Sequence, residues 1–159
     1  MQNKRIIIVG KGGSGKDYLK NKFVEKGFNP SVSFTTRKPR VGEIEGIDYY
    51  YCSSEKFSSM IKNQELYEYK EFRGWFYGTS LKEFNSAEIF IMTPPAILEL
   101  AKKDRKNSFI IYLDIDERIR EIRLSNRNDA DSVDRRLKAD KEMFENFNDY
   151  DLRISKPDF

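Results

Sequence analysis

A glycine-rich segment, Gly10–Lys16, separates an apolar segment from an amphipathic one, and this order constrains the fold more than any other feature. The preceding Arg5–Val9 is mostly apolar and β-branched, which is typical of a strand buried on both faces. The following Asp17–Lys26 has its apolar residues at helical spacing, and Gly27 closes it. A strand, a loop and a helix in this order predict an α/β fold with a parallel sheet covered by helices.

The glycine-rich segment also has the spacing of a phosphate-binding loop (P-loop): a glycine, four residues, then a glycine and a lysine. Glycines let backbone N–H groups turn toward an anion, and the next helix adds its positive N-terminal end. Lys16 is placed to reach the β- and γ-phosphates of ATP, and a simple glycine turn would not require it. The predicted ATP-binding residues are Gly10, Lys11, Gly12, Gly13, Ser14, Gly15, Lys16 and Asp17.

Asp17 departs from the P-loop pattern, which has Ser or Thr after the lysine to place a hydroxyl on Mg²⁺. A carboxylate is also a good Mg²⁺ ligand, so Asp17 is a candidate metal ligand with ATP as phosphoryl donor. An acidic residue in the first turn of a helix is also favourable without any metal. Both interpretations stay open at this point.

Composition excludes several classes of protein. The 159 residues suffice for one domain and contain no histidine and one cysteine, which excludes imidazole chemistry and an internal disulfide. Any metal must therefore bind to oxygen, which favours Mg²⁺. The net charge of +3 is too small to suggest a protein that coats nucleic acid. The apolar runs are too short to span a membrane. We expect a cytoplasmic protein, a monomer or a homodimer, that binds neither nucleic acid nor membrane.

The chain between residues 32 and 80 is aromatic and predicts a small, mainly β insertion rather than another βαβ unit. Its expected strands are Tyr49–Cys52, Leu66–Phe72 and Trp75–Tyr77, with a helix at 55–62 and a turn at Arg73–Gly74. The α/β pattern then resumes, with expected strands Glu88–Met92, Ser108–Leu113 and Leu152–Ile154. Helices are expected after Pro94–Pro95, from Asp116 to about Arg127 and over Val133–Phe147, with a polar break at Asn128–Ser132 between the last two.

The segment Ser33–Tyr49 carries an ordered set of anion-binding groups. Arg37 and Arg40 are three apart and held by Pro39, so they can contact one phosphate from two sides. Tyr49 can add a hydroxyl. A surface loop without such a role would carry scattered charges.

These motifs together resemble the guanylate kinase family over nearly the whole chain. The matching segments, in the order of the family, are Gly10–Lys16, Ser33–Arg40, Gly46–Tyr49, Glu68 and Phe72–Thr79. The resemblance implies a P-loop NTPase fold of class α/β, with a parallel sheet flanked by helices, a small mainly β insertion that binds a nucleoside monophosphate (NMP), and a helical lid. It implies a single domain with core 1–31, 81–122 and 137–159, NMP-binding region 32–80 and lid 123–136.

The resemblance also implies residue roles. Arg37, Arg40, Tyr49 and Tyr77 would hold the phosphate of GMP, while Ser33, Glu68 and Thr79 would read its guanine. Gly78 is also expected to bind GMP. The chemistry agrees, because one carboxylate can accept hydrogen bonds from both N1–H and the 2-amino group of guanine. Adenine lacks these donors and would leave Glu68 unpaired.

Arginines near the polar break match the family's mobile lid. Arg123, Arg127 and Arg136 align with lid residues, whereas Arg118, Arg120 and Arg135 better suit a solvated helix face. Phosphoryl transfer requires charge neutralisation and positioning rather than a strong base. The expected catalytic residues are Lys16, Arg37, Arg123, Arg127 and Arg136.

The family pattern fails at the strand that ends near Thr93. Ile91 and Thr93 stand where the family carries acidic residues, so those magnesium and substrate contacts are missing. Asp114 imitates an acidic metal ligand of P-loop proteins, but Asp114 and Asp116 are expected to cap a helix.

The sequence therefore predicts a nucleoside monophosphate kinase that converts ATP and GMP (or dGMP) to ADP and GDP (or dGDP) with Mg²⁺. Two alternatives stay open. One is a non-catalytic guanylate-kinase-like module that binds a phosphopeptide through Arg37, Arg40 and Tyr49. The other is a related kinase whose acceptor is a different (deoxy)nucleotide or a sugar phosphate.

Overall fold

The computed structural model describes residues 4–127 and 132–159, and the chain divides into two compact units. The first comprises the described residues up to Phe28 together with Glu88–Phe159, and the second is Asn29–Ala87. The second unit extends beyond the expected 32–80 segment because helix α3 (Leu81–Ser86) packs on strands of this unit. Residues 81–87 therefore belong with the insertion rather than with the core.

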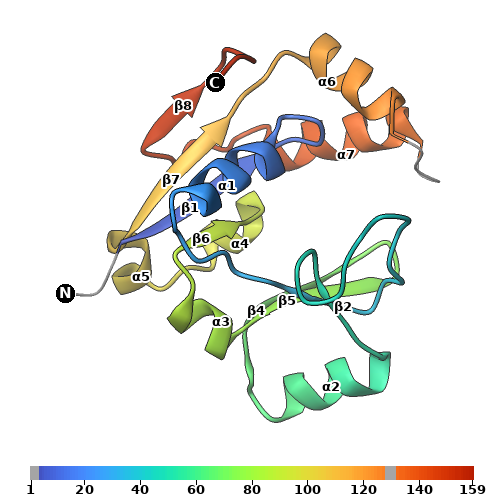
Figure 1. The fold of residues 1–159 in the computed structure, drawn as a ribbon, viewed down its shortest axis with the longest axis vertical. Coiled ribbons are helices and arrows are strands. Elements are labelled where there is room, and N and C mark those ends of the chain that lie inside the picture. The colour runs from blue at the N-terminus through green and yellow to red at the C-terminus, as the bar shows by residue number, and fades with distance from the viewer. Residues whose placement is uncertain (1–3, 128–131) are drawn as a thin grey trace. The chain divides into compact units, whose positions relative to one another are not determined.

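The first unit contains a four-stranded parallel sheet in the order β6-β1-β7-β8 (Figure 1). Its strands are β1 (Arg5–Gly10), β6 (Ile89–Ile91), β7 (Ser108–Leu113) and β8 (Leu152–Ile154). Ile8 of the central β1 lies opposite Ile91 on one side and Ile111 on the other. The parallel sheet expected from the first strand, loop and helix is confirmed.

Helices cover both faces of this sheet because the apolar side chains of each strand alternate between faces. The helices are α1 (Lys16–Glu25), α4 (Pro94–Leu98), α5 (Lys102–Lys106), α6 (Glu117–Ser125) and α7 (Val133–Phe144). Ile8 and Leu113 belong to a core cluster with Leu19 of α1 and Ile119 of α6. On the other face the ring of Tyr112 stacks on Phe144 of α7, with centroids 5.5 Å apart.

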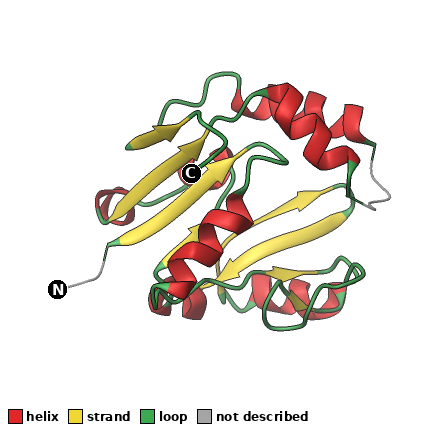
Figure 2. Ribbon diagram, turned by 45° about the horizontal axis from the view of Figure 1, so that its top comes forward, coloured by secondary structure: helices red, strands yellow, loops and turns green. Residues whose placement is uncertain are grey.

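The second unit contains a mixed sheet in the order β3-β2-β5-β4. Strands are the yellow arrows in Figure 2. Its elements are β2 (Phe34–Thr35), β3 (Tyr50–Tyr51), α2 (Ser54–Lys62), β4 (Leu66–Phe72), β5 (Trp75–Ser80) and α3. Phe57 of α2 is fully buried and stacks on Phe76, at 5.4 Å between centroids. Arg73 and Gly74 both have positive φ, as a tight turn between antiparallel strands requires.

Three short elements were not expected from the sequence: β2, α3 and α5. The α3 start has a sequence signal, because Ser80 accepts a hydrogen bond from the backbone N–H of Glu83 in the Ser-x-x-Glu arrangement of a capping box. Helix α7 ends at Phe144 rather than at Phe147. Most of the expected polar break, residues 128–131, lies outside the described residues.

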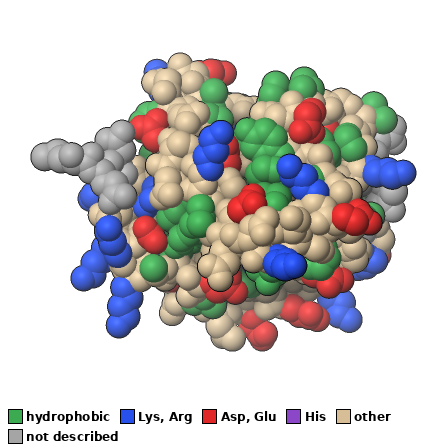
Figure 3. Space-filling view, turned by 90° about the horizontal axis from the view of Figure 1, so that it is seen from below, with side chains coloured by type: hydrophobic (Ala, Val, Ile, Leu, Met, Phe, Trp, Pro, Cys, Tyr) green, Lys and Arg blue, Asp and Glu red, His purple; other side chains and the backbone are tan. Residues whose placement is uncertain are grey.

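On the face drawn in Figure 3, Lys and Arg side chains are interspersed with Asp and Glu rather than gathered in one basic field. Within the part of the chain that the structure describes, no helix combines the length and the apolar character that crossing a membrane demands.

Candidate active site

The phosphate loop connects β1 to α1 and is shaped by its glycines. Gly13 and Gly15 have φ values of 77° and 95°, a region that favours glycine. Helix α1 begins at Lys16, and the residue before it, Gly15, supplies no side-chain cap. The first N–H groups of the helix thus have no acceptor within the helix and can bind an anion.

Lys16 folds back over this loop. Its Nζ donates hydrogen bonds to the carbonyl oxygens of Gly10 at 2.7 Å and Lys11 at 3.1 Å. Burial of the ammonium group lowers the pKa of Lys16 to about 8, while the carboxylates of Asp140 and Asp17 oppose this shift. The loop therefore holds an ammonium group whose charged form is disfavoured by burial.

Two arginines of helix α6 donate hydrogen bonds to carbonyl oxygens of the phosphate loop. Arg123 donates from Nη1 to the Gly13 carbonyl oxygen at 3.0 Å. Arg120 donates from Nε to the Ile115 carbonyl oxygen at 3.0 Å and from Nη1 to that of Gly12 at 3.5 Å. The expectation that Arg120 lies on a solvated face is wrong, because Arg120 is only 2% exposed. Its length lets the guanidinium turn inward from the helix to carbonyls of the loop.

The other expected lid arginines are placed differently. Arg127 is exposed just after α6, and its charge contributes to lowering the pKa of Lys16. Arg136 is half-buried in the first turns of α7. Arg118 and Arg135 are exposed, as expected for a solvated face. The expected lid, 123–136, includes residues 128–131, which lie outside the described residues.

Asp17 points to solvent from the first turn of α1. Its side chain is 77% exposed and pairs with Lys20 at 3.3 Å. Among the residues that the structure describes, no three acidic or cysteine side chains gather closely enough to hold a metal ion by themselves. A Mg²⁺ ion commonly takes one or two carboxylates and completes its shell with phosphates and water, so a single carboxylate next to the phosphate loop fits such an ion.

The structure explains the residues that follow β6 and β7, where the chain departs from the family pattern. Thr93 caps α4 by accepting a hydrogen bond from the N–H of Ala96, and a threonine suits that position. Asp116 caps α6, as expected. Asp114 does not cap: it pairs with Arg153 at 2.6 Å and accepts from the Tyr112 hydroxyl at 3.1 Å.

In the second unit, Arg37 is the buried centre of the acceptor segment. It is 6% exposed and forms a two-pronged ion pair with Glu43, at 3.0 Å from Nη1 and 2.9 Å from Nη2. Nη1 also donates to the Lys38 carbonyl oxygen at 2.8 Å. The guanidinium lies 5.4 Å from the centre of the Tyr49 ring, within the range of a cation–π contact.

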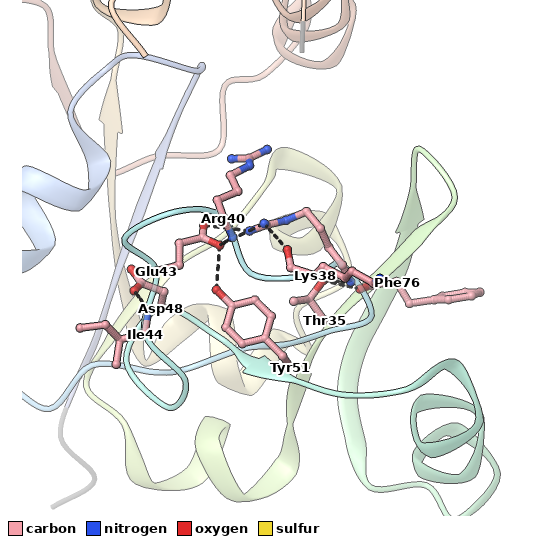
Figure 4. Close-up of polar contacts among 9 residues, drawn as sticks. Thr35, Lys38, Arg40, Glu43, Ile44, Asp48, Tyr51 and Phe76 are labelled. Carbon is pink, nitrogen blue, oxygen red and sulfur yellow. Dashed lines mark hydrogen bonds and ion pairs between the residues drawn. The ribbon is translucent and has the colours of Figure 1, made fainter. Parts of the chain in front are cut away.

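Glu43 is the hub of this loop (Figure 4). Besides Arg37, it accepts hydrogen bonds from the Arg40 backbone N–H at 2.7 Å and the Tyr51 hydroxyl at 2.8 Å. Burial acts to raise its pKa, but the hydrogen bonds from Arg37, the Arg40 N–H and Tyr51 prevail and lower it to about 2. Glu43 thus stays ionised at neutral pH and fixes both the Arg37 guanidinium and the backbone that carries Arg40.

The remaining phosphate-binding candidates lie around the same loop. The rings of Tyr49 and Tyr77 approach edge to face, with centroids 6.0 Å apart. The side chain of Arg40 is exposed. The structure therefore brings Arg37, Tyr49 and Tyr77 together, with Arg40 beside them on the loop.

The guanine-binding candidates lie on β4 and β5. Glu68 is half-buried and accepts a hydrogen bond from the buried Thr79 hydroxyl at 2.8 Å. Gly78, next to Thr79, has no room for a side chain, because a Cβ there would lie 3.0 Å from the Glu68 carbonyl oxygen. The backbone of Ser33 accepts from the Tyr50 N–H at 2.9 Å, which joins its segment to β3.

Comparison with known proteins decides the family. The family model described as guanylate kinase matches residues 2–159. The chain belongs to the guanylate kinase family. The guanylate kinase of Nostoc sp. is 30% identical over 175 residues, which cover 100% of this chain and 85% of that relative.

Other family members agree over different lengths. The guanylate kinase of Latilactobacillus sakei is 33% identical over 150 residues, 75% of this chain and 74% of the relative. That of Lactobacillus johnsonii is 45% identical, but the match spans 50% of this chain and 41% of the relative. The crystal structure of guanylate kinase from Anaplasma phagocytophilum has a TM-score of 0.73 at 24% identity, covering 99% of this chain and 79% of that one. It confirms the P-loop α/β fold.

Three residues of this site escaped the sequence analysis. Glu43 had a local signal, because a buried arginine needs a carboxylate and Glu43 lies in the same loop. Arg120 and Asp140 had no such local signal, since each contacts Gly12 of the loop across more than a hundred residues of sequence. Asp140, on α7, accepts a hydrogen bond from the Gly12 N–H at 2.8 Å.

Proposed function

We propose that this chain is an active guanylate kinase, which transfers the γ-phosphoryl group of ATP to GMP or dGMP. The family match and the names of the relatives support ATP-dependent phosphorylation of GMP. The observation that carries the proposal is the presence in one chain of a glycine-rich phosphate loop with the half-buried Lys16 folded over it, and of the Glu68 carboxylate held by Thr79.

The donor nucleotide binds at the phosphate loop. The N–H groups at the start of α1, which have no acceptor within the helix, bind the phosphates, and Lys16 exchanges its carbonyl partners for β- and γ-phosphate oxygens. Arg123, already on the loop, holds it in shape, while Arg127 and Arg136 add positive charge.

The acceptor nucleotide binds in the second unit. Arg37 and Arg40 contact the GMP phosphate, with hydroxyls from Tyr49 and Tyr77. Glu43 positions Arg37. Glu68 accepts from guanine while Thr79 and Ser33 fix the base edge. A chain without histidine suffices for this reaction, because positioning and charge neutralisation provide most of the catalysis.

Magnesium is the expected cofactor, and Asp17 is the residue next to Lys16 that could hold it. The ion, when bound, neutralises phosphate charge. To contact it, Asp17 must leave the pair with Lys20. Cytoplasmic location, a monomeric or homodimeric state and the absence of nucleic-acid partners remain predictions.

The alternatives are disfavoured by the same residues. A phosphopeptide-binding module has no use for Lys16 or the arginine that fastens the phosphate loop. A sugar phosphate offers nothing to the Glu68 carboxylate. The missing acids at Ile91 and Thr93 are the feature that favours a changed nucleotide acceptor.

The test is a coupled assay of ADP release across the common nucleoside monophosphates. GMP or dGMP should exceed AMP, CMP and UMP by about 10²–10⁴-fold in kcat/KM, since a wrong base leaves Glu68 unpaired. Glu68→Gln should erode this preference, while Glu71→Gln, an exposed position on the same strand, should leave it intact. Equal turnover of AMP and GMP by the unmodified chain would contradict the proposal.

A further inference from the structure

The phosphate loop carries an anion of its own. The Asp140 carboxylate reaches from α7 and accepts a hydrogen bond from the Gly12 N–H at 2.8 Å, across 128 residues of sequence. Asp140 is half-buried, and a Cβ on Gly12 would lie 3.2 Å from its Oδ2. The carboxylate is thus packed directly against the backbone of the loop.

Several groups around this contact favour negative charge, and they outnumber the exposed Asp17 carboxylate in the first turn of α1. Helix α1 starts without a side-chain cap, so the positive end of its dipole faces the loop. Lys16 is held beside it on neutral carbonyl oxygens. Arg120 and Arg123 add two guanidinium groups on the carbonyls of Gly12 and Gly13. A carboxylate within this cluster supplies charge that a phosphate would otherwise supply.

One further observation links the carboxylate to Lys16. Burial lowers the pKa of Lys16, and among the charges that raise it again the Asp140 carboxylate has the largest effect. The Asp140 charge therefore acts on Lys16. The carboxylate therefore acts on the same lysine that a bound phosphate would contact.

We propose that Asp140 is a built-in competitor of the nucleotide: its carboxylate occupies the Gly12 N–H while the loop is empty, and bound phosphate displaces it. The inference rests on the proposed function, in which this loop binds ATP. Displacement breaks a charge-assisted hydrogen bond and leaves a carboxylate close to phosphate oxygens. Asp140 consequently weakens the binding of ATP and of ADP, and so sets KM for ATP and favours release of the product.

The test compares the unmodified chain with Asp140→Asn, Asp140→Ala and the control Glu142→Gln, an exposed acid on the same helix. An asparagine can still accept from the Gly12 N–H but carries no charge. Calorimetry with ATP, in Mg²⁺ and separately in chelator, measures affinity, and thermal unfolding shows that each variant is folded. A steady-state assay separates KM for ATP from kcat.

Asp140→Asn should bind ATP about tenfold more tightly than the parent in both conditions, because a like charge has been removed. KM for ATP should fall with it, and Glu142→Gln should match the parent. Equal affinity in all four proteins would overturn the inference while leaving the proposed function standing.

Other outcomes also decide the question. Weaker binding of Asp140→Asn in Mg²⁺ only would make Asp140 a metal ligand, and weaker binding of Asp140→Ala alone would make it a mere support of the loop. Either result overturns the competition. ATP binding by none of the four proteins would contradict the proposed function itself and the inference with it.

Discussion

The two regions of this chain that we propose bind nucleotides would hold a phosphate with different chemical groups. In the first unit the anion site is made of backbone, and its Lys16 rests on neutral carbonyl oxygens. In the second unit the anion site is made of side chains, and its buried Arg37 rests on an ionised Glu43. A lysine on carbonyls loses little when it leaves them, whereas a buried ion pair is costly to break.

The difference indicates which residues serve folding as well as binding. Removing Lys16 leaves hydrogen-bond acceptors that water can satisfy. Removing Arg37 leaves the Glu43 carboxylate, whose side chain is only 19% exposed, without its main partner. We therefore expect substitutions of the charged residues in the second region to lower the stability of the fold, and substitution of Lys16 in the first region to affect mainly nucleotide binding.

The largest expected effect is that of Arg37→Met. It should lower the free energy of unfolding by about 3 kcal/mol, since the uncompensated Glu43 remains. It should also weaken GMP binding by about 100-fold, because a two-pronged phosphate ligand is lost. Denaturant unfolding and calorimetry with GMP measure the two effects.

A second variant separates the two roles of Arg37. Arg37→Met with Glu43→Gln should regain most of the stability but none of the GMP affinity. Arg40→Met, at an exposed side chain, should stay within about 0.5 kcal/mol of the parent in stability and still bind GMP more weakly. An Arg37→Met protein as stable as the parent would remove the contrast between the two regions.

A smaller effect is expected from the pH dependence of the phosphate loop. The pKa of Lys16 is about 8 in the free chain, and bound phosphate stabilises the ammonium form and raises it. ATP affinity should therefore be unaffected by Lys16 below pH 8 and should fall above it, by at most about tenfold per pH unit, with proton uptake on binding. Calorimetry at pH 7 and pH 9, in buffers of different ionisation enthalpy, measures both.

Lys16→Arg is the matched control, because a guanidinium keeps its charge throughout this range. Between pH 7 and pH 9 the arginine in this variant should contribute no pH dependence to the affinity for ATP. Equal pH dependence in the parent and in Lys16→Arg would assign the effect to another group.

The smallest expected effect concerns Asp17. Its pair with Lys20 is at the surface, so Asp17→Asn and Asp17→Ser should change the free energy of unfolding by less than about 0.5 kcal/mol. A change in ATP binding would then report on the metal rather than on folding. If Asp17 holds Mg²⁺, Asp17→Ser should weaken the Mg²⁺ dependence of ATP affinity, and Asp17→Asn should lower turnover. Identical Mg²⁺ dependence in the three proteins would reduce Asp17 to a favourable acid at a helix start.

Strong local patterns in the sequence were sufficient to predict the central strands and the phosphate loop of the first unit. The apolar Ile6–Val9, the glycines of the loop and the apolar Ser108–Leu113 predicted β1, the phosphate loop and β7 because each is specified by neighbours in sequence. Weak or short elements were missed. Helix α3 has the Ser80–Glu83 capping signal but only six residues, and β2 consists of two residues that pair only because β3 and β5 lie beside them.

By itself, the sequence determined the glycine and lysine spacing of the phosphate loop, the strand and helix on either side of this loop, and the presence of Arg37, Arg40 and Glu68 in a family-like order. Only the tertiary structure decided which partner each charge takes. The packing of α6 and α7 near the loop turned Arg120 inward and brought Asp140 to the Gly12 N–H. Such contacts depend on how helices pack on a finished sheet, and no spacing along the chain encodes them.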